Sequence, residues 1–209
     1  MTHTQANGDN RTVLKWMIAA VSVLLLVAAT PVTSFFRRDG KPLTIVKSGG
    51  DIDVEAAPQG ANLTTMGGDI HVGRVDGAAR LKTMGGDIQV DAASGSVSAT
   101  TMAGMIEAHI VGASGDGRHI NLSSNQGHIT LVVPKDFPMT VEVTLAHTDN
   151  QTETFRVIDN VGLQQVKKDG WDRSHGTPRA YIYANGRVGS GLNHVVISTV
   201  NGNVTLTGK

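Results

Sequence analysis

One hexapeptide occurs twice in this chain. The residues Thr-Met-Gly-Gly-Asp-Ile stand at 65–70 and again, letter for letter, at 83–88, eighteen positions later. Aligned at that period, the sequence reads SGGDIDVEAAPQGANLTT, MGGDIHVGRVDGAARLKT and MGGDIQVDAASGSVSATT over 48–101, and a fourth unit begins MAGMIEAHIV at Met102. A short fixed period is typical of repeat architectures, in which each unit buries its apolar face against its neighbours.

Within each unit, apolar residues alternate with polar ones. Ile70 and Val72 flank His71, and Ala79 and Leu81 flank a polar arginine. A period of two predicts a β-strand with one buried face. Each unit therefore holds two short strands, which are separated by a Gly-Gly corner and by a looser corner.

Two strands per unit are compatible with hairpins or with a coil. Hairpins would make neighbouring strands antiparallel, and they would not require identical residues at every eighteenth position. A coil stacks the repeated residues in register, with parallel strands about 4.8 Å apart. We therefore predict an all-β fold, a single-stranded parallel β-solenoid or β-helix with rungs of about 18 residues. The inward ladder is expected to be Ile52, Ile70, Ile88, Ile106, Ile129 and Val204, with Met66, Met84 and Met102 stacked at one corner.

The repeat pattern continues beyond the four clear units. The stretch SSNQGHITL at 123–131 recurs as STVNGNVTL at 198–206, so the last rung is of the same kind. The longer excursion between them, at 134–193, is expected to help cap an exposed end of the sheets. Strand-like pieces lie at 139–146, 154–158 and 181–183, with irregular rungs expected over 159–179.

An uncharged run, WMIAAVSVLLLVAATPV, precedes the repeats at 16–32. It is close to the minimum length of a membrane-spanning helix, and it follows Arg11 and Lys15. The small residues at 27–29 are compatible with signal-peptide cleavage, so a cleaved signal, an uncleaved anchor and a buried core helix are the three readings. The expected organisation is a basic N-terminal tail at 1–15, a hydrophobic helix acting as transmembrane anchor or signal peptide at 16–33, a linker at 34–42 and the β-solenoid at 43–209.

The charge balance and the cysteine content exclude several classes of function. Lys+Arg and Asp+Glu number 18 each, so no net charge points to nucleic acid. There is no cysteine, which excludes disulfides, thiolate chemistry and a cysteine-attached lipid. A cysteine-free β domain behind an export-like segment is expected outside the cytoplasm. We predict an inner-membrane-anchored periplasmic domain, or export to the periplasm or cell surface.

The aspartates that follow the Gly pairs, Asp51, Asp69 and Asp87, are predicted to form one column. Calcium-binding β-rolls use G-G-x-G-x-D-x-U-x, whereas this chain has no second Gly-x-Asp and a period twice as long. The other reading is an aspartate that caps each corner. Because the fourth rung replaces the aspartate by Met105, we expect solvent-facing corner caps without tight metal binding.

No catalytic constellation emerges from the sequence. The histidines include no H-x-x-x-H or H-E-x-x-H pattern, and His71, His109 and His128 fall at polar positions of strands or turns. We read them as solvated surface. No G-x-S-x-G elbow occurs. The sequence thus predicts a non-enzyme with no catalytic, cofactor-binding or metal-binding residues and no cofactor.

The GGDI-x-V units, the wider region and the closing T-x-N-G-x-V-x-L rung at 199–206 resemble the bacterial adhesin family of exported β-strand-repeat proteins, a domain of unknown function. The likeness covers residues 43–206. It implies a parallel β-helix-like fold in the cell envelope, often behind a membrane segment. It carries over no catalytic residues.

Three functions remain open at this point. The first is a non-catalytic envelope module that binds an envelope protein or a surface polysaccharide and meets the membrane through 16–33, with no nucleic-acid partner. The second is a bactofilin-like, membrane-attached scaffold that assembles from copies of itself by end-to-end or edge stacking. The third is an enzyme that acts on polysaccharides from a β-helix.

Overall fold

The structure is a computed structural model of the 209-residue chain, and it describes residues 40–112, 117–174 and 176–209. These residues fall in one compact unit, Val32–Lys209. Their regular structure is all β, as predicted, and no helix occurs among them. The strands are β1 (Leu43–Val46), β2 (Ile52–Ala57), β3 (Ala61–Thr64), β4 (Ile70–Val75), β5 (Ala79–Lys82), β6 (Ile88–Ala93), β7 (Val97–Thr101), β8 (Ile106–Ile110), β9 (His119–Ser124), β10 (Ile129–Val133), β11 (Met139–Thr148), β12 (Val157–Asp159), β13 (Gln164–Lys167), β14 (Arg179–Val188), β15 (Asn193–Val200) and β16 (Val204–Gly208).

The expected tail at 1–15, the hydrophobic segment at 16–33 and most of the expected linker, 34–39, lie outside the described residues. Within the described part of the chain, no helix has the length and apolar character needed to cross a membrane.

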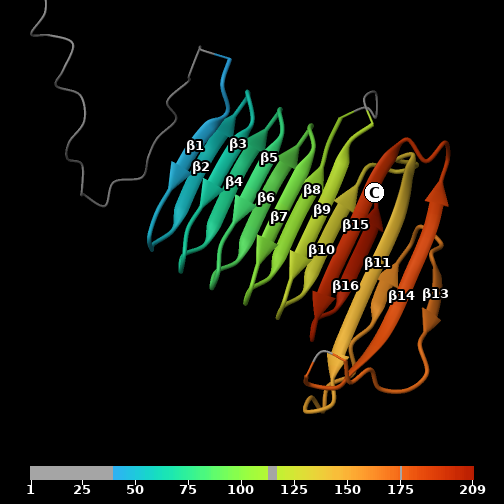
Figure 1. Cartoon of the computed structure of the whole chain (residues 1–209). Helices are drawn as coiled ribbons and strands as arrows, with labels where there is room; N and C mark the ends of the chain where they lie inside the picture. Colours follow the sequence, from blue (N-terminus) through green and yellow to red (C-terminus); the bar gives the residue numbers. More distant parts are fainter. Residues whose placement is uncertain (1–39, 113–116, 175) are drawn as a thin grey trace, which may run out of the picture. The chain divides into compact units, whose positions relative to one another are not determined.

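The strands form two sheets, and successive strands from β1 to β10 alternate between them (Figure 1). The nine-stranded sheet has the order β1-β3-β5-β7-β9-β15-β11-β14-β13, and the seven-stranded sheet has the order β12-β16-β10-β8-β6-β4-β2. We call one strand from each sheet, with its corner, a rung. Neighbouring repeat strands pair in parallel one period apart, so that Ile52 lies opposite Ile70 and Ile70 opposite Ile88.

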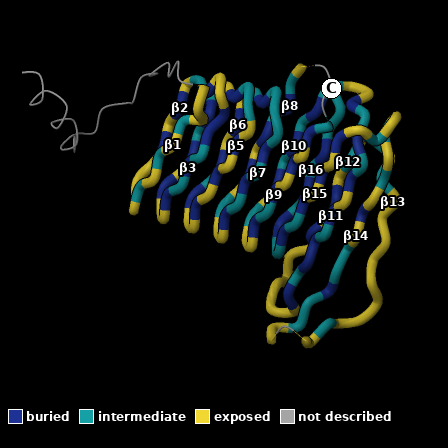
Figure 2. The backbone as a smooth tube through the Cα atoms, turned by 45° about the horizontal axis from the view of Figure 1, so that its top comes forward, coloured by how far each residue is buried: buried dark blue, intermediate teal, exposed yellow. Residues whose placement is uncertain are grey.

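The inward side chains of both sheets form one core. Buried positions alternate with half-buried and exposed ones along the repeat strands (Figure 2). A fully buried isoleucine or leucine contributes roughly 1.5–3 kcal/mol relative to an exposed one. The predicted ladder is confirmed: Ile52, Ile70, Ile88, Ile106, Ile129 and Val204 are paired in register, and each is at most 1% exposed.

The last two strands of the chain do not lie at the end of the sheets. β15 pairs with β9 on one side and with β11 on the other, and β16 lies between β10 and β12. The excursion at 134–193 therefore passes beyond the place that β15 and β16 fill. Its strands form the end of both sheets that lies opposite β1 and β2, which is the position of a cap.

The parallel pairing expected of the solenoid does not extend to this end. β14 pairs antiparallel with β11, and β13 pairs antiparallel with β14. Val188 at the end of β14 and Asn193 at the start of β15 both lie opposite Met139, so residues 189–192 connect them across the end of β11. A parallel β14 would end at the far side and would require a much longer crossover. β13 lies within 159–179, where irregular rungs were expected.

The Gly-Gly corners at 67–68 and 85–86 are tight at their second glycine, whereas Gly50 in the first corner has open space and a φ of 78°. A Cβ placed on Gly68 would lie 2.2 Å from the carbonyl carbon and oxygen of Gly50 in the previous rung. A Cβ on Gly67 would meet nothing within 4 Å. Close approach of successive rungs, and not a left-handed backbone, is therefore the reason for glycine at this position.

Candidate functional site

The corners that follow β3, β5, β7, β9 and β15 of the nine-stranded sheet are each closed by a buried hydroxyl. The Oγ1 of Thr83 donates to the carbonyl oxygen of Gly68 at 2.9 Å, and it accepts from the amide of Gly86 at 3.2 Å. Because a buried hydroxyl without a partner is costly, this pairing fixes the corner. The same hydroxyl-to-carbonyl bond occurs at Thr65, Thr101, Ser124 and Thr199.

The aspartate column was predicted to cap the corners, and it does so across rungs. The amide of Asp69 donates to Oδ1 of Asp51 at 2.9 Å, and the amide of Asp87 donates to Oδ1 of Asp69 at 2.8 Å. Asp87 in turn accepts from the amide of Met105 at 2.7 Å. Each carboxylate thus binds the equivalent amide of the next rung. No cluster of three or more metal-ligating side chains occurs in the ranges that the structure describes.

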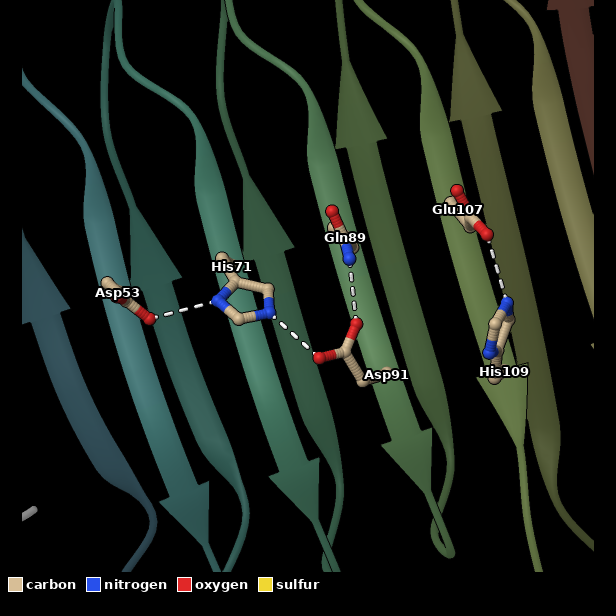
Figure 3. A network of polar contacts seen from close by, with 6 residues as sticks. All are labelled: Asp53, His71, Gln89, Asp91, Glu107 and His109. Carbon is tan, nitrogen blue, oxygen red and sulfur yellow. Dashed lines mark hydrogen bonds and ion pairs between the residues drawn. The ribbon is translucent and has the colours of Figure 1, made fainter.

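The outward face of the seven-stranded sheet carries a second polar network (Figure 3). The ring of His71 lies between two carboxylates: Nδ1 is 3.0 Å from Oδ1 of Asp53, and Nε2 is 2.9 Å from Oδ2 of Asp91. Gln89 donates to the other oxygen of Asp91 at 2.8 Å. A separate pair lies two strands further on, where Nε2 of His109 is 3.0 Å from Oε1 of Glu107.

This network changes the acid–base properties of its members. The hydrogen bond to Asp91, followed by that to Asp53, raises the pKa of His71 above its ordinary value, although partial burial acts in the opposite direction. The hydrogen bonds from His71 and Gln89 lower the pKa of Asp91. His71 is 40% exposed, so solvent screens these charges. The reading of His71 as simple solvated surface therefore missed an ion-pair chain.

A cleft of about 570 Å³ opens at the corner that the hydroxyls close. One wall is formed by corner residues of successive rungs. The other wall is the far end of β11 and the start of β14, which extend beyond the corners of the other strands together with their loops (Figure 1). The described lining residues are Met84, Met102, Ala103, Asn125, Gln126, Thr148, Asn150, Gln151, Thr177, Arg179, Val200 and Asn201.

Side-chain hydrogen bonds hold the two walls together. The amide of Thr148 donates to Oδ1 of Asn201 at 2.9 Å, and Nδ2 of Asn201 donates to Oγ1 of Thr148 at 3.0 Å. The Thr148 hydroxyl also donates to Oδ1 of Asn150 at 2.5 Å. Asn201 has a φ of 54°, a left-handed conformation that asparagine tolerates better than most residues. These hydrogen bonds fix the positions of Thr148, Asn150 and Asn201 in the cleft lining.

Arg179 brings the positive charge of the cleft. Its backbone pairs with Asp172 through two hydrogen bonds of 2.8 and 2.9 Å, which fix the start of β14. Its side-chain Nε is buried and has no hydrogen-bond partner. Buried donors without a partner are uncommon in proteins. Arg179 thus lines the cleft with a buried Nε that lacks the hydrogen-bond partner it would ordinarily have.

The sequence singled out none of these lining residues as a site. They come from separate rungs and from the excursion, where no repeat predicts which side chains meet. The aspartate column and the pairing of His71 with Asp53 follow from the period, whereas the cleft depends on where β11 ends and β14 begins. Comparisons with models of known protein families, with curated proteins and with solved structures give no match for this chain.

Proposed function

We propose that this protein is a non-catalytic binding module of the bacterial cell envelope, of the adhesin-like kind, and that the corner cleft is its binding site. The observation that carries the proposal is the half-buried Arg179, whose Nε has no hydrogen-bond partner, in an open cleft lined by amides and hydroxyls. Binding clefts combine shape with a few well-placed polar groups. This cleft has both.

The fold proposed for the module is a β-solenoid. The alternation of strands between two sheets and the register of one period per rung support a continuous coil. Hydroxyl and carboxylate columns that bind from rung to rung support a rigid surface, which suits a site held in one geometry. In this proposal, residues 16–33 anchor the module or direct its export, and the cleft lies on the periplasmic or outer side of the membrane.

A catalytic role on polysaccharides has less support. Glycoside cleavage ordinarily uses a pair of carboxyl groups that flank the bond to be broken. The described lining residues include neither a carboxylate nor an imidazole. The acid–base network of His71 lies instead on the outward strand face, away from the cleft lining.

Two experiments test the proposed function. C-terminal fusions to alkaline phosphatase and to a cytoplasm-dependent fluorescent protein should give phosphatase activity and no fluorescence. Purified full chain in mild detergent should co-sediment with isolated cell-envelope polymer, and Arg179→Gln should reduce the bound fraction severalfold, whereas Arg173→Gln should not. A fluorescent fusion without phosphatase activity, or equal sedimentation of all three proteins, would contradict the proposal.

A self-assembling, bactofilin-like scaffold is the second candidate. Among the described strands, β1 and β2 are each paired on one side only, which leaves the backbone groups of one rung open to another chain. If this edge drives assembly, sedimentation velocity should show species that grow with concentration, and electron microscopy should show filaments. A monomer at all concentrations would favour the binding module.

A further inference from the structure

We infer that the corner cleft binds a saccharide that carries a carboxylate, that is, a glycan containing uronic acid, with Arg179 as the partner of the carboxylate. This inference rests on the proposed binding function and gives it a ligand class. It follows from three properties of the lining: its charge, its hydrogen-bonding groups and its apolar corner residues.

The described lining carries one charge, and that charge is positive. Arg179 is the one ionisable side chain among the described lining residues. A guanidinium matches the two oxygens of a carboxylate in a planar, bidentate geometry. Nε of Arg179 is buried and has no hydrogen-bond partner, so an anion beside the guanidinium would supply a favourable interaction that the described contacts do not provide. A polyphosphate backbone would instead require several cations.

The remaining polar groups suit hydroxyls. Asn125 and Gln126 belong to the corner wall, and Asn150, Gln151 and Thr177 belong to the opposite loops. A side-chain amide offers both donors and acceptors, and a hydroxyl likewise acts in both roles. A sugar hydroxyl needs both roles, so this lining can pair with several hydroxyls at once.

The corner wall also presents apolar surface. The side chains of Met84 and Met102 are 43% and 49% exposed and line the cleft. Methionine is flexible and polarisable, and it adapts to irregular apolar surfaces such as the C–H face of a sugar ring. Met66 continues this column one rung further and is also exposed, so an extended chain can run out of the cleft along the corner.

A peptide is a weaker fit to the same cleft. Extended peptides are ordinarily bound by main-chain hydrogen bonds to an open sheet edge. At this corner two backbone groups are already engaged: the amide of Thr148 donates to Asn201, and the carbonyl of Gly127 accepts from Thr199. The lining offers amide and hydroxyl side chains in place of such an edge.

The test is a calorimetric titration of the full chain in mild detergent with trigalacturonate and with its neutral, carboxyl-reduced counterpart, trigalactose. Trigalacturonate should bind at least about tenfold more tightly than trigalactose, the difference expected for one charge-assisted hydrogen-bonded pair. Arg179→Gln should abolish this preference. Arg173→Gln, an exposed arginine in the same connection, is the matched control and should keep it.

Further variants keep the test decisive. If Arg179→Gln lowers the melting temperature, Asn125→Asp is used instead. It places a negative charge on the opposite wall and should weaken the binding of trigalacturonate but not that of trigalactose. Equal affinity for the two sugars, or equal loss in both arginine variants, would overturn the inference. Preferential, Arg179-dependent binding of a peptide C-terminal carboxylate would also overturn it. If trigalacturonate does not bind while binding to the envelope polymer still depends on Arg179, the proposed binding function stands and the proposed ligand class is wrong.

Discussion

Ile70 and His71 are adjacent in the chain and have opposite environments. Ile70 is 1% exposed in the middle of the inward ladder, whereas the His71 side chain is 40% exposed on the outer face. Replacing a buried isoleucine by alanine removes apolar burial and leaves a cavity. Ile70→Ala should therefore lower the free energy of unfolding by about 2–5 kcal/mol.

The matched change on the outer face is His71→Ala. It removes exposed ion pairs only, so it should lower the free energy of unfolding by less than about 1 kcal/mol. Urea denaturation of the full chain in detergent measures both changes through their midpoints. Equal midpoints would contradict the assignment of inward and outward faces.

The His71 network also predicts a pH dependence. Because its carboxylate partners raise the folded pKa above the ordinary value of 6.5, the network stabilises the fold fully below that pH. The contribution is lost as the pH rises through the raised pKa. Urea midpoints measured between pH 5.5 and 8.5 (a range around the ordinary histidine pKa of about 6.5) should fall more steeply for the native chain than for His71→Asn.

The pH dependence contributed by His147 has the opposite sign. Burial, and to a smaller extent the positive charge of Lys167, lowers the pKa of His147. Its contribution is present above the ordinary value and is lost as the pH falls through the lowered pKa. The comparison with His71→Asn isolates one network, because His147 is the same in both proteins. Parallel pH profiles for the two proteins would show that the ion pairs do not form.

For single residues, the sequence correctly predicted the environments that recur with the eighteen-residue period. The alternation of apolar and polar residues placed the isoleucine ladder correctly, because every rung imposes the same environment. The pairing of His71 with Asp53 was within reach, since the period puts these residues side by side. The position of Arg179 could not be predicted, because residues 134–193 contain no repeat and the neighbours of Arg179 come from distant segments.

At the level of the corner, the two glycines of the 67–68 pair have different roles. A Cβ on Gly68 would collide with the backbone of Gly50, so Gly68→Ala forces neighbouring rungs apart. We expect a loss of about 1–3 kcal/mol or more, as for overpacked sites. Gly67 has open space and no left-handed φ, so Gly67→Ala should be neutral or stabilise by up to about 1 kcal/mol. Thermal unfolding of the two variants checks the difference, and similar losses in both would argue against close rung packing.

The carboxylate column suggests a stabilising change. Asp51, Asp69 and Asp87 each accept from the amide of the next rung, but the thioether of Met105 offers no comparable acceptor. Asn203 performs this role in a later rung, where its Oδ1 accepts from the amide of Arg156 at 2.9 Å. Met105→Asn should therefore raise the free energy of unfolding by about 0.5–1.5 kcal/mol.

The control for this change is Met66→Asn. Met66 is exposed to a similar degree, 56% against 51% for Met105, but it lies outside the column. It should change the stability by no more than about 0.5 kcal/mol. Chemical denaturation of both variants measures the effect. A gain shared by both, or by neither, would refute the role assigned to the column.

For the whole molecule, the eighteen-residue period predicted the parallel ladders and the two faces, because in-register stacking is what identical residues require. It did not predict that β15 lies between β9 and β11. The stretches at 123–131 and 198–206 are so alike that either order of stacking satisfies the pattern. The order is decided by the strands of the excursion, whose antiparallel pairs carry no repeat.

The central claim is that one period advances the chain by one strand spacing. The outward residues Asp53, His71, Gln89, Glu107, Thr130 and Thr205 are successive register partners in the seven-stranded sheet. The chain has no cysteine, so spin labels at Asp53→Cys and Thr205→Cys report one distance by pulsed electron paramagnetic resonance.

At about 4.8 Å per strand, the backbones at these two positions should lie about 24 Å apart, with the label linkers broadening the distribution. A meander of hairpins would place two strands of the same sheet in each period and would give roughly twice that distance, about 48 Å. A main distance near 24 Å is the predicted result, and one near 48 Å would contradict the account.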